Sequence, residues 1–329
     1  MDTRANRLRR QAKLRSKYET AAESILESFL LEPKKSFSSC DLARLGIDLM
    51  PFDPFDQDFL QSRKCLFKPL PKDVLAEYFI DPSELLDGDH TALKWLEHPS
   101  SSVNLSSPLR AAVTIFSYLE TTYLHLQRKT PKGYLFEVAK WQFIMCDDDF
   151  HDANGFYNHP FPSPMPVWSY LYMMQHCTEQ GGKLITLPHL QLIMGNDAVP
   201  KENEILPGEL GPIVQGILAR LNQPDFDHTS LFPVQMLSLF GPRDGRILQA
   251  RFYPSGRLVI RATQIYRFER HNQDDLATLF LRFWLSEPCI GDEYEFYVDE
   301  ESPGGLPQAV IALSSTSVVK AKQVSHAYS

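Results

Sequence analysis

The sequence predicts an α+β fold, in which a mainly helical N-terminal half packs on a C-terminal antiparallel β-meander with a covering helix. In several segments before residue 128, apolar residues recur at the spacing of helices. Between residues 231 and 268 the pattern changes to that of strands separated by turns that contain Gly and Pro. The composition, with 43% hydrophobic and 22% charged residues, is typical of a chain with a packed core.

Two helices are predicted most clearly in the N-terminal half. Residues 108–127 begin with Pro108, which suits the first position of a helix, and continue with a regular apolar stripe. Residues 4–31 form the other helix, and Pro33 ends it. Its basic residues precede most of its apolar stripe, so we expect it to dock by its second half and to leave its basic half in solvent. That stripe consists of Leu14, Tyr18, Ala21, Ala22, Ile25 and Phe29.

The other segments of this half give weaker signals. Residues 36–72 are expected to be irregular because prolines interrupt them, although their aromatic residues favour an ordered, packed segment. Short helices are expected at about 72–80 and 83–97. Residues 134–146 are apolar and fit either a helix or a strand.

A proline-rich segment at 159–166 marks the best domain boundary, because proline at every second position forces an extended backbone. It divides a mainly helical region, residues 1–158, from an α+β region, residues 167–329. One continuous domain is the alternative, since a chain of 329 residues fits one large domain or two ordinary ones.

Helices and strands alternate in the second region. Helices are predicted at 167–179, 209–222 and 274–286, the first followed by a turn at Gly181-Gly182. Residues 293–299 alternate apolar and acidic residues, which predicts a strand with one acidic face.

A hairpin with a defined register is predicted between residues 246 and 268. Pro254-Ser255-Gly256 suits a three-residue loop and pairs Tyr253 with Arg257. A two-residue loop would mix apolar and polar side chains on both faces, so burial selects the three-residue register. The apolar face then contains Leu248, Ala250, Phe252, Leu258, Ile260 and Ala262.

The net charge of −8 is unevenly distributed. Residues 1–18 contain seven bases and one acid, and residues 243–270 contain seven arginines and two acids. These two basic islands carry +6 and +5, so the rest of the chain carries −19. The acidic total excludes a protein that coats nucleic acid or anionic membrane with its whole surface, and it directs attention to the islands.

The first candidate site is the arginine-bearing face of the hairpin, where guanidinium groups suit phosphate or carboxylate. Tyr253 among these arginines fits single-stranded nucleic acid or a phosphorylated peptide. The competing interpretation is that the acidic face of residues 293–299 pairs with the arginines across the sheet. The predicted binding residues are Arg243, Arg251, Arg257, Arg261 and Arg267.

The second candidate is an acidic cluster that contains Asp147, Asp149 and His151. In a helix, Asp147 and His151 would be neighbours four residues apart and could share a metal ion, which would favour metal-dependent hydrolysis. The spacing matches no established metal motif. A solvated acidic loop is therefore the competing interpretation.

The five cysteines include no CxxC pair, so neither a zinc ribbon nor a thioredoxin-like redox site is predicted. We also expect no cofactor, because nucleotide-binding and nucleophile motifs are absent from the sequence. No apolar stretch approaches the length of a membrane span, and no apolar run follows the basic N-terminus as in a secretory signal. A soluble protein of the cytoplasm or nucleus is therefore predicted; a mitochondrial presequence and a nuclear-localisation signal remain alternatives for the basic N-terminus.

One segment resembles a known group of sequences. Residues 233–250, with Gly241-Pro242 and the run Arg246-Ile-Leu-Gln-Ala, continue through Leu258-Val-Ile-Arg to Tyr266. With the following Leu-, Phe- and Trp-rich helix, this block resembles a segment of uncharacterised filamentous-fungal proteins. The resemblance covers about residues 230–286 and implies no activity.

The sequence therefore favours a non-catalytic interaction or regulatory protein with a protein partner. One alternative is a binder of nucleic acid or of a phosphorylated ligand through the arginine face. The other alternative is a metal-dependent hydrolase at the Asp147–Asp152 cluster.

Overall fold

One mixed β-sheet of eight strands forms the centre of the fold in the computed structural model, which describes residues 4–62, 64–94, 108–144 and 167–289. The strand order is β1-β11-β10-β9-β8-β7-β6, and the short β12 pairs with β10. Neighbouring strands are antiparallel except for β1 with β11 and β8 with β9, which are parallel. The strands are β1 (Ile47–Pro51), β6 (Trp141–Phe143), β7 (Trp168–Gln180), β8 (Lys183–Asn196), β9 (Val234–Phe240), β10 (Asp244–Phe252), β11 (Leu258–Ala262) and β12 (Tyr266–Arg267).

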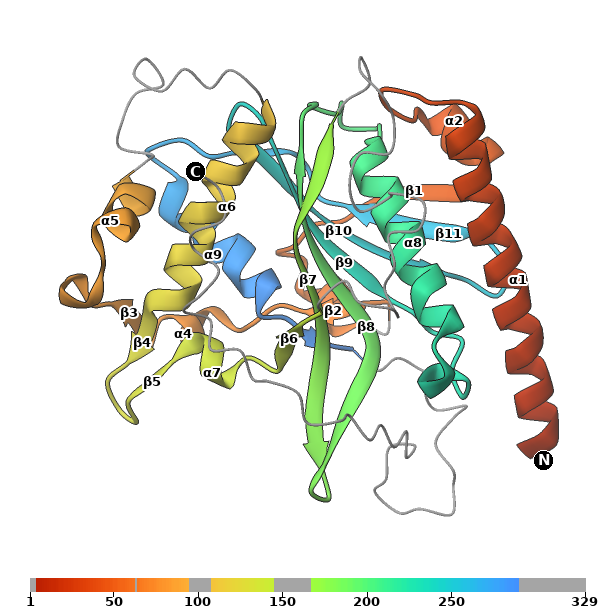
Figure 1. Ribbon diagram of the computed structural model, residues 1–329, viewed down its shortest axis with the longest axis horizontal. Helices are drawn as coiled ribbons and strands as arrows, with labels where there is room; N and C mark the ends of the chain where they lie inside the picture. The colour runs from red at the N-terminus through yellow and green to blue at the C-terminus, as the bar shows by residue number, and fades with distance from the viewer. Residues whose placement is uncertain (1–3, 63, 95–107, 145–166, 290–329) are drawn as a thin grey trace.

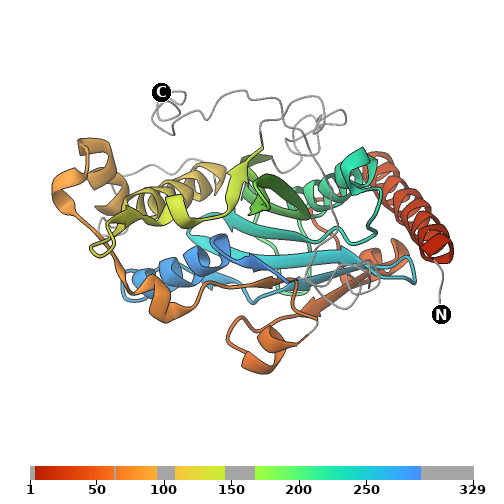
Figure 2. The ribbon, with the colours of Figure 1, turned by 90° about the horizontal axis from the view of Figure 1, so that it is seen from below.

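Long helices cover both faces of this sheet, which confirms the α+β class. Figure 1 shows α6 (Pro108–His125) and α9 (Gln273–Trp284) on one side and α8 (Pro207–Asn222) and α1 (Arg4–Leu31) on the other. Figure 2 shows the same separation from below. The α9 helix packs on the antiparallel strands β9 and β10, as the predicted covering helix requires.

Smaller elements surround the two layers of helices. Two strands pair as β2 with β13, and three pair in the order β3-β4-β5. These strands are β2 (Phe67–Lys68), β13 (Glu287–Pro288), β3 (Tyr78–Ile80), β4 (Leu126–Arg128) and β5 (Gly133–Tyr134). The short helices are α2 (Ser39–Arg44), α3 (Gln57–Gln61), α4 (Lys72–Leu75), α5 (Asp87–Lys94) and α7 (Leu135–Val138), with 3-10 turns η1 (Pro82–Glu84) and η4 (Pro224–Phe226).

The hairpin register predicted from the apolar pattern is confirmed. Phe252 lies opposite Leu258, and the Tyr253 amide donates a hydrogen bond to the Arg257 carbonyl at 3.0 Å. The loop ends at Gly256, whose φ of +84° is in the left-handed region that glycine adopts without strain. All six residues of the predicted apolar face are buried in one core cluster.

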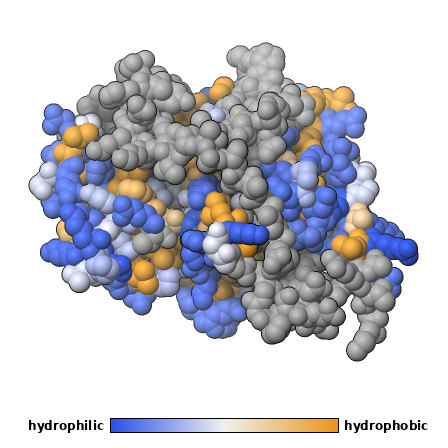
Figure 3. Space-filling model, turned by 60° about the horizontal axis from the view of Figure 1, so that its bottom comes forward, coloured by the Kyte–Doolittle hydropathy of each residue, from blue (hydrophilic) through white to orange (hydrophobic). Residues whose placement is uncertain are grey.

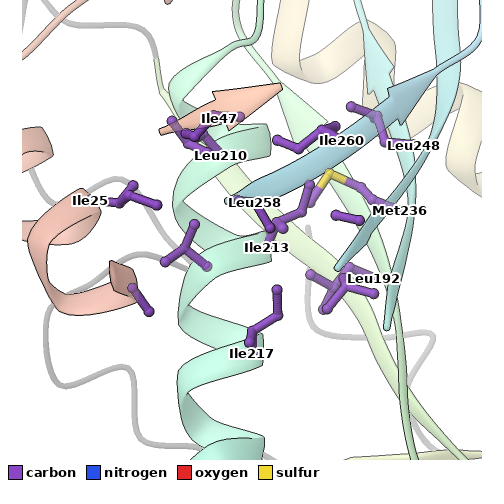
Figure 4. Packing of buried hydrophobic residues seen from close by; sticks show 14 of the residues in the cluster. Ile25, Ile47, Leu192, Leu210, Ile213, Ile217, Met236, Leu248, Leu258 and Ile260 are labelled. Carbon is purple, nitrogen blue, oxygen red and sulfur yellow. The ribbon is translucent and has the colours of Figure 1, made fainter. Parts of the chain in front are cut away.

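That cluster fills the space between the sheet and the helices α1 and α8. Figure 4 shows Ile213 and Ile217 on the side of α8 that faces Met236 and Leu258 of the sheet, with Ile25 of α1 on the other side of α8. The second core cluster lies on the opposite face of the sheet, against α6 and α9. Because both faces are buried, the central strands β9 and β10 are buried at every position.

The N-terminal helix is confirmed, but its basic half is not left wholly in solvent. Arg15 donates hydrogen bonds to the carbonyls of Leu221, Phe226 and Thr229, where α8 and the turn after it end. Helix C-termini carry unpaired carbonyls and a partial negative charge, so this arginine caps α8. The expectation is confirmed for Arg9, Arg10 and Lys13, whose side chains are exposed, and wrong for Arg15. The apolar periodicity predicts apolar contacts and cannot reveal a charged cap.

Several segments differ from the predicted secondary structure. Residues 167–179 were predicted to be a helix and form strand β7 instead. Residues 36–72 were expected to be irregular, but they contain α2, β1, α3 and β2. The ambiguous segment 134–146 includes both the short helix α7 and the strand β6. The short helix expected at 83–97 is divided into η1 and α5, and Asp81 caps η1 through the Ser83 amide.

The predicted connector at 159–166 and the predicted strand at 293–299 lie outside the described residues. Strands β1 and β6 come from the chain before the connector, and they pair with β11 and β7 from the chain after it.

Candidate anion-binding site

The predicted arginine face lies on the hairpin and on the short strand that follows it. Arg251 is on β10, Arg261 on β11 and Arg267 on β12, whereas Arg257 precedes β11 in the loop. Arg243 is in the turn between β9 and β10, and its carbonyl accepts a hydrogen bond from Phe268 at 2.8 Å. The other four arginines divide into two that are paired with aspartates and two that form an arginine–tyrosine cluster.

Arg257 and Arg267 each form a two-bond ion pair with an aspartate. The Arg257 Nε and Nη2 atoms lie 2.7 and 2.5 Å from the carboxylate oxygens of Asp48. Those hydrogen bonds lower the pKa of Asp48 and raise that of Arg257. Arg267 binds Asp244 in the same manner at 2.9 and 3.2 Å, and that bond raises the pKa of Arg267.

These two pairs mean that neighbouring strands already neutralise part of the arginine face. Asp48 comes from β1 and Asp244 from the start of β10, not from the acidic segment at 293–299 that the sequence suggested. Both interactions are partly exposed, because the Arg257 and Arg267 side chains are 42% and 60% accessible. The Arg257–Asp48 pair, which is accessible on both sides, therefore contributes little to folding, whereas Asp244 is only 2% accessible and needs Arg267 as its partner.

Arg251 and Arg261 converge on Tyr253 and form what we call the arginine–tyrosine cluster. The Arg251 guanidinium lies over the Tyr253 ring, 4.2 Å from its centre. The Arg261 Nη2 donates a hydrogen bond to the Tyr253 hydroxyl at 3.0 Å, and its guanidinium also lies 5.7 Å from the ring of Phe59 on α3. Both arginines are buried, with 8% and 6% of their surface exposed, whereas Tyr253 is half-buried.

The electrostatics of this cluster favour a negative charge. Burial alone would raise the pKa of Tyr253, but hydrogen bonds from Arg261 and Arg251 and their positive charge outweigh it and lower the pKa. The Nη1 atom of Arg261 is buried and has no hydrogen-bond partner among the described residues. A buried donor without an acceptor costs about 1–3 kcal/mol, and more when it is charged, so an acceptor at this position would be stabilising.

A row of buried glutamines beside this cluster was missed in the sequence. Gln191, Gln235 and Gln249 lie opposite one another on β8, β9 and β10, and Arg261 on β11 continues the row. Each glutamine is completely buried. The only sequence signal was an amide inside each apolar strand, which does not by itself indicate that the three residues are neighbours.

Main-chain groups of the overlying segments hold the glutamine row. The Nε2 atoms of Gln191 and Gln235 donate to the Phe283 carbonyl at 2.9 and 2.6 Å, and Gln249 donates to the Phe67 carbonyl at 3.3 Å. The row therefore joins the sheet to the end of α9 and to β2. Its amides bind carbonyls in the manner of a structural network, and they do not supply an acid or a base.

Two buried histidines lie on the same face, toward β7. Burial lowers the pKa of His189 to about 3 and that of His176 to about 4, so both rings are neutral near pH 7. They pack edge-on against Phe67 and Trp141, with ring centres 5.3 and 5.2 Å apart. These histidines are therefore core residues, and the neighbouring Cys177 is also buried.

A separate cavity of about 450 Å³ lies between α4, α6 and α9. Its lining is mostly apolar, and its polar groups include Tyr118 and Asp274, whose oxygens are 3.5 Å apart. Burial, together with the Asp274 charge, raises the pKa of Tyr118, so this phenol is a poor acid at neutral pH. No arginine of the predicted face lines this cavity.

The predicted metal ligands Asp147, Asp149 and His151 lie outside the described residues. Within the described ranges, no group of three His, Cys, Asp or Glu side chains is placed to hold a metal ion. Nor does any helix there have the length and apolar character needed to cross a membrane. Figure 3 shows one face of the molecule, on which hydrophobic residues occur in small groups among hydrophilic ones.

No family model, curated protein or solved structure matches the chain. The resemblance of residues 230–286 to filamentous-fungal proteins thus stays a prediction, and the interpretation of the site depends on its geometry.

Proposed function

We propose that the chain is a non-catalytic interaction protein that binds a phosphate-bearing group of a protein partner through Arg251, Tyr253 and Arg261. The observation that supports it is the buried Nη1 donor of Arg261, which has no acceptor among the described residues although Nη2 is held by Tyr253. Guanidinium N–H groups form their strongest bonds with phosphate and carboxylate oxygens. An acceptor bound there would lie beside the half-buried Tyr253, next to a second guanidinium.

A single phosphate group fits this cluster better than a polynucleotide does. A single strand of nucleic acid needs a basic groove that follows its backbone over several nucleotides. Arg257 and Arg267, the arginines that would extend such a groove, are each bound to an aspartate. At the other basic island, Arg15 and Lys17 bind main-chain carbonyls.

The proposal is tested by equilibrium binding of phenyl phosphate to the full chain, with an oligothymidylate as the competing probe. The double variant Arg251→Glu and Arg261→Glu should lose at least about tenfold in affinity, because each charge-assisted bond contributes about 1.5–3 kcal/mol. Arg257→Gln is the matched control, since this arginine lies on the same hairpin but is paired with Asp48. It should leave the affinity within about twofold.

Unchanged phenyl phosphate binding by the double variant, with the fold intact, would refute the proposal. If the oligothymidylate alone binds, with an affinity that falls steeply with salt, the nucleic-acid alternative replaces it. Should the double variant fail to fold, Arg261→Gln keeps the test open, because it removes the unpaired donor without adding a negative charge.

The hydrolase alternative gains no support from the described residues, and we propose no cofactor. Residence in the cytoplasm or nucleus is part of the proposal, and a fluorescently tagged chain tests it directly.

A further inference from the structure

A pair of cysteines meets where β2 pairs with β13. Cys65 lies just before β2, and Cys289 directly follows β13. The strands are antiparallel, with Phe67 opposite Pro288, and the Cys289 amide donates to the Leu66 carbonyl at 2.9 Å. The two thiols are close enough for each to shift the pKa of the other.

The two cysteines differ in exposure and in acidity. Cys65 is 1% exposed and its Sγ donates to the Phe67 carbonyl at 3.3 Å, whereas Cys289 is half-buried. Contact with the Cys65 side chain is the main cause of the lowered pKa of Cys289, and the positive charge of Lys68 adds to it. The same contact raises the pKa of Cys65, with burial as the second cause. Cys289 is therefore the more acidic thiol of the two, and Cys65 keeps its proton to higher pH.

We propose that Cys65 and Cys289 are a site of reversible oxidation, in which Cys289 reacts with a hydroperoxide and Cys65 then closes a disulfide bond. The Cys289 thiolate attacks one peroxide oxygen, the O–O bond breaks, and the leaving alkoxide or hydroxide takes a proton from water. The Cys289 sulfenic acid is then attacked by the sulfur of Cys65, which forms the S–S bond and releases one water molecule. Two thiols are oxidised and one hydroperoxide is reduced to an alcohol or water.

The exposure of the two cysteines suits these roles. The half-buried Cys289 sulfur is accessible to the oxidant, and the buried Cys65 sulfur is placed to react with the oxidised Cys289. The sequence has no CxxC motif that would reveal this pair, because Cys65 and Cys289 are far apart in the chain and only the pairing of β2 with β13 brings them together. The bond would fasten β13 to β2, and both segments also hold the glutamine row: Phe67 accepts from Gln249, and the Ser286 hydroxyl lies 3.1 Å from Gln235. This inference does not depend on the proposed binding of phosphate.

The test treats the full chain with hydrogen peroxide, blocks remaining thiols by alkylation and maps the peptides by mass spectrometry. We expect a Cys65–Cys289 linked peptide and an intact mass lower by about 2 Da, the mass of two hydrogen atoms, both reversed by a dithiol reductant. Cys65→Ser should leave Cys289 as a sulfenic acid that dimedone traps. Cys289→Ser should leave Cys65 reduced.

Cys40 is the matched control, because it is exposed and does not belong to the β2–β13 contact. Cys40→Ser should not change the yield of the linked peptide. The proposal fails if Cys65 and Cys289 stay reduced in the unmodified sequence, or if the pH midpoint of Cys289 alkylation is not below the ordinary 9.0. Both measurements use the natural sequence, so they decide the matter even if a cysteine variant does not fold.

Discussion

Replacing Arg246 by methionine should destabilise the fold severely. Its Nε donates to Glu209 Oε1 at 2.8 Å, its Nη2 binds the other oxygen of Glu209, and Nη2 also donates to the Glu204 carbonyl at 2.9 Å. Both charged side chains are completely buried, between β10 and α8. Methionine fills a similar volume, so the main effect is the loss of the positive charge and not a cavity.

The expected magnitude follows from what remains after the substitution. Glu209 would keep only the Leu206 amide, at 2.8 Å, as a donor to a carboxylate with no solvent contact. Breaking one side of a buried ion pair costs about 3–5 kcal/mol. A domain is stable by about 5–15 kcal/mol, so this single change would remove a large part of the total.

A double-mutant cycle with Glu209→Gln separates the charge from the rest of the side chain. Glutamine keeps an oxygen for the Leu206 amide, so the start of α8 stays capped. Either single variant leaves one buried charge alone, whereas the double variant leaves none. The double variant should therefore be no less stable than Arg246→Met alone, which gives a coupling energy of about 3 kcal/mol.

Urea unfolding followed by circular dichroism measures these free energies, provided that all variants unfold with the same dependence on urea. The exposed pair of Arg257 with Asp48 is the control, and Arg257→Gln should leave the free energy of unfolding almost unchanged. The reasoning is refuted if Arg246→Met lowers the free energy of unfolding by less than about 1.5 kcal/mol, or if the effects of the two single variants are additive, because the Arg246–Glu209 pair would then not stabilise the fold as a unit.

Three further predictions concern the packing of the same fold. Arg15→Ala removes the cap from α8 and should lower the free energy of unfolding by about 2 kcal/mol, as measured by urea unfolding; a loss below about 0.5 kcal/mol would mean that water replaces the cap. Because burial lowers the pKa of His189 from 6.5 to about 3, the unfolded chain binds a proton that the folded chain excludes, and stability is lost as the pH falls below 6.5. His189→Gln should therefore reduce the pH dependence of unfolding between about pH 6 and pH 4, by up to about 1.4 kcal/mol per pH unit, and an unchanged slope would contradict this reasoning. Gly208→Ala places a Cβ 2.5 Å from the Cβ of Trp168 and should cost about 1–3 kcal/mol in thermal unfolding, whereas Gly88→Ala, with open space around it, should cost nothing.

The hairpin was predictable because its information is local. Pro254 and Gly256 fix the loop, and only one register places Leu248 and Leu258 on the same buried face. By contrast, the partner of β1 is about 210 residues away, and nothing near Ile47 indicates β11. Local patterns determine turns and faces, but pairing between distant segments depends on the whole fold.

The wrong helix at 167–179 has a specific cause. Strand β7 changes register between Tyr170 and Tyr172 and again between Gln175 and Cys177. Such irregularities break the alternation of a strand. As a result, the buried residues of β7 include Met173, Met174, His176 and Cys177. The last three follow Met173 by one, three and four residues, and residues at these spacings also share one face of a helix.

The candidate site was predictable only in part. The pattern placed Arg251, Arg257 and Arg261 on one hairpin face, but not which arginine would be paired. Asp48 reaches Arg257 because β1 adds to the sheet edge, and that addition is a long-range event. The same limit hid the role of Arg246, which belongs to the basic island but faces α8 and Glu209 instead of solvent.

The two outer strands of the sheet, β1 and β6, are synthesised before all the inner strands that lie between them. β1 waits for β11, which emerges about 210 residues later. At about 5–20 residues per second on the ribosome, that wait lasts on the order of 10–40 s. During this time the apolar Ile47 has no neighbouring strand to cover it. The first strand made is thus among the last to be paired.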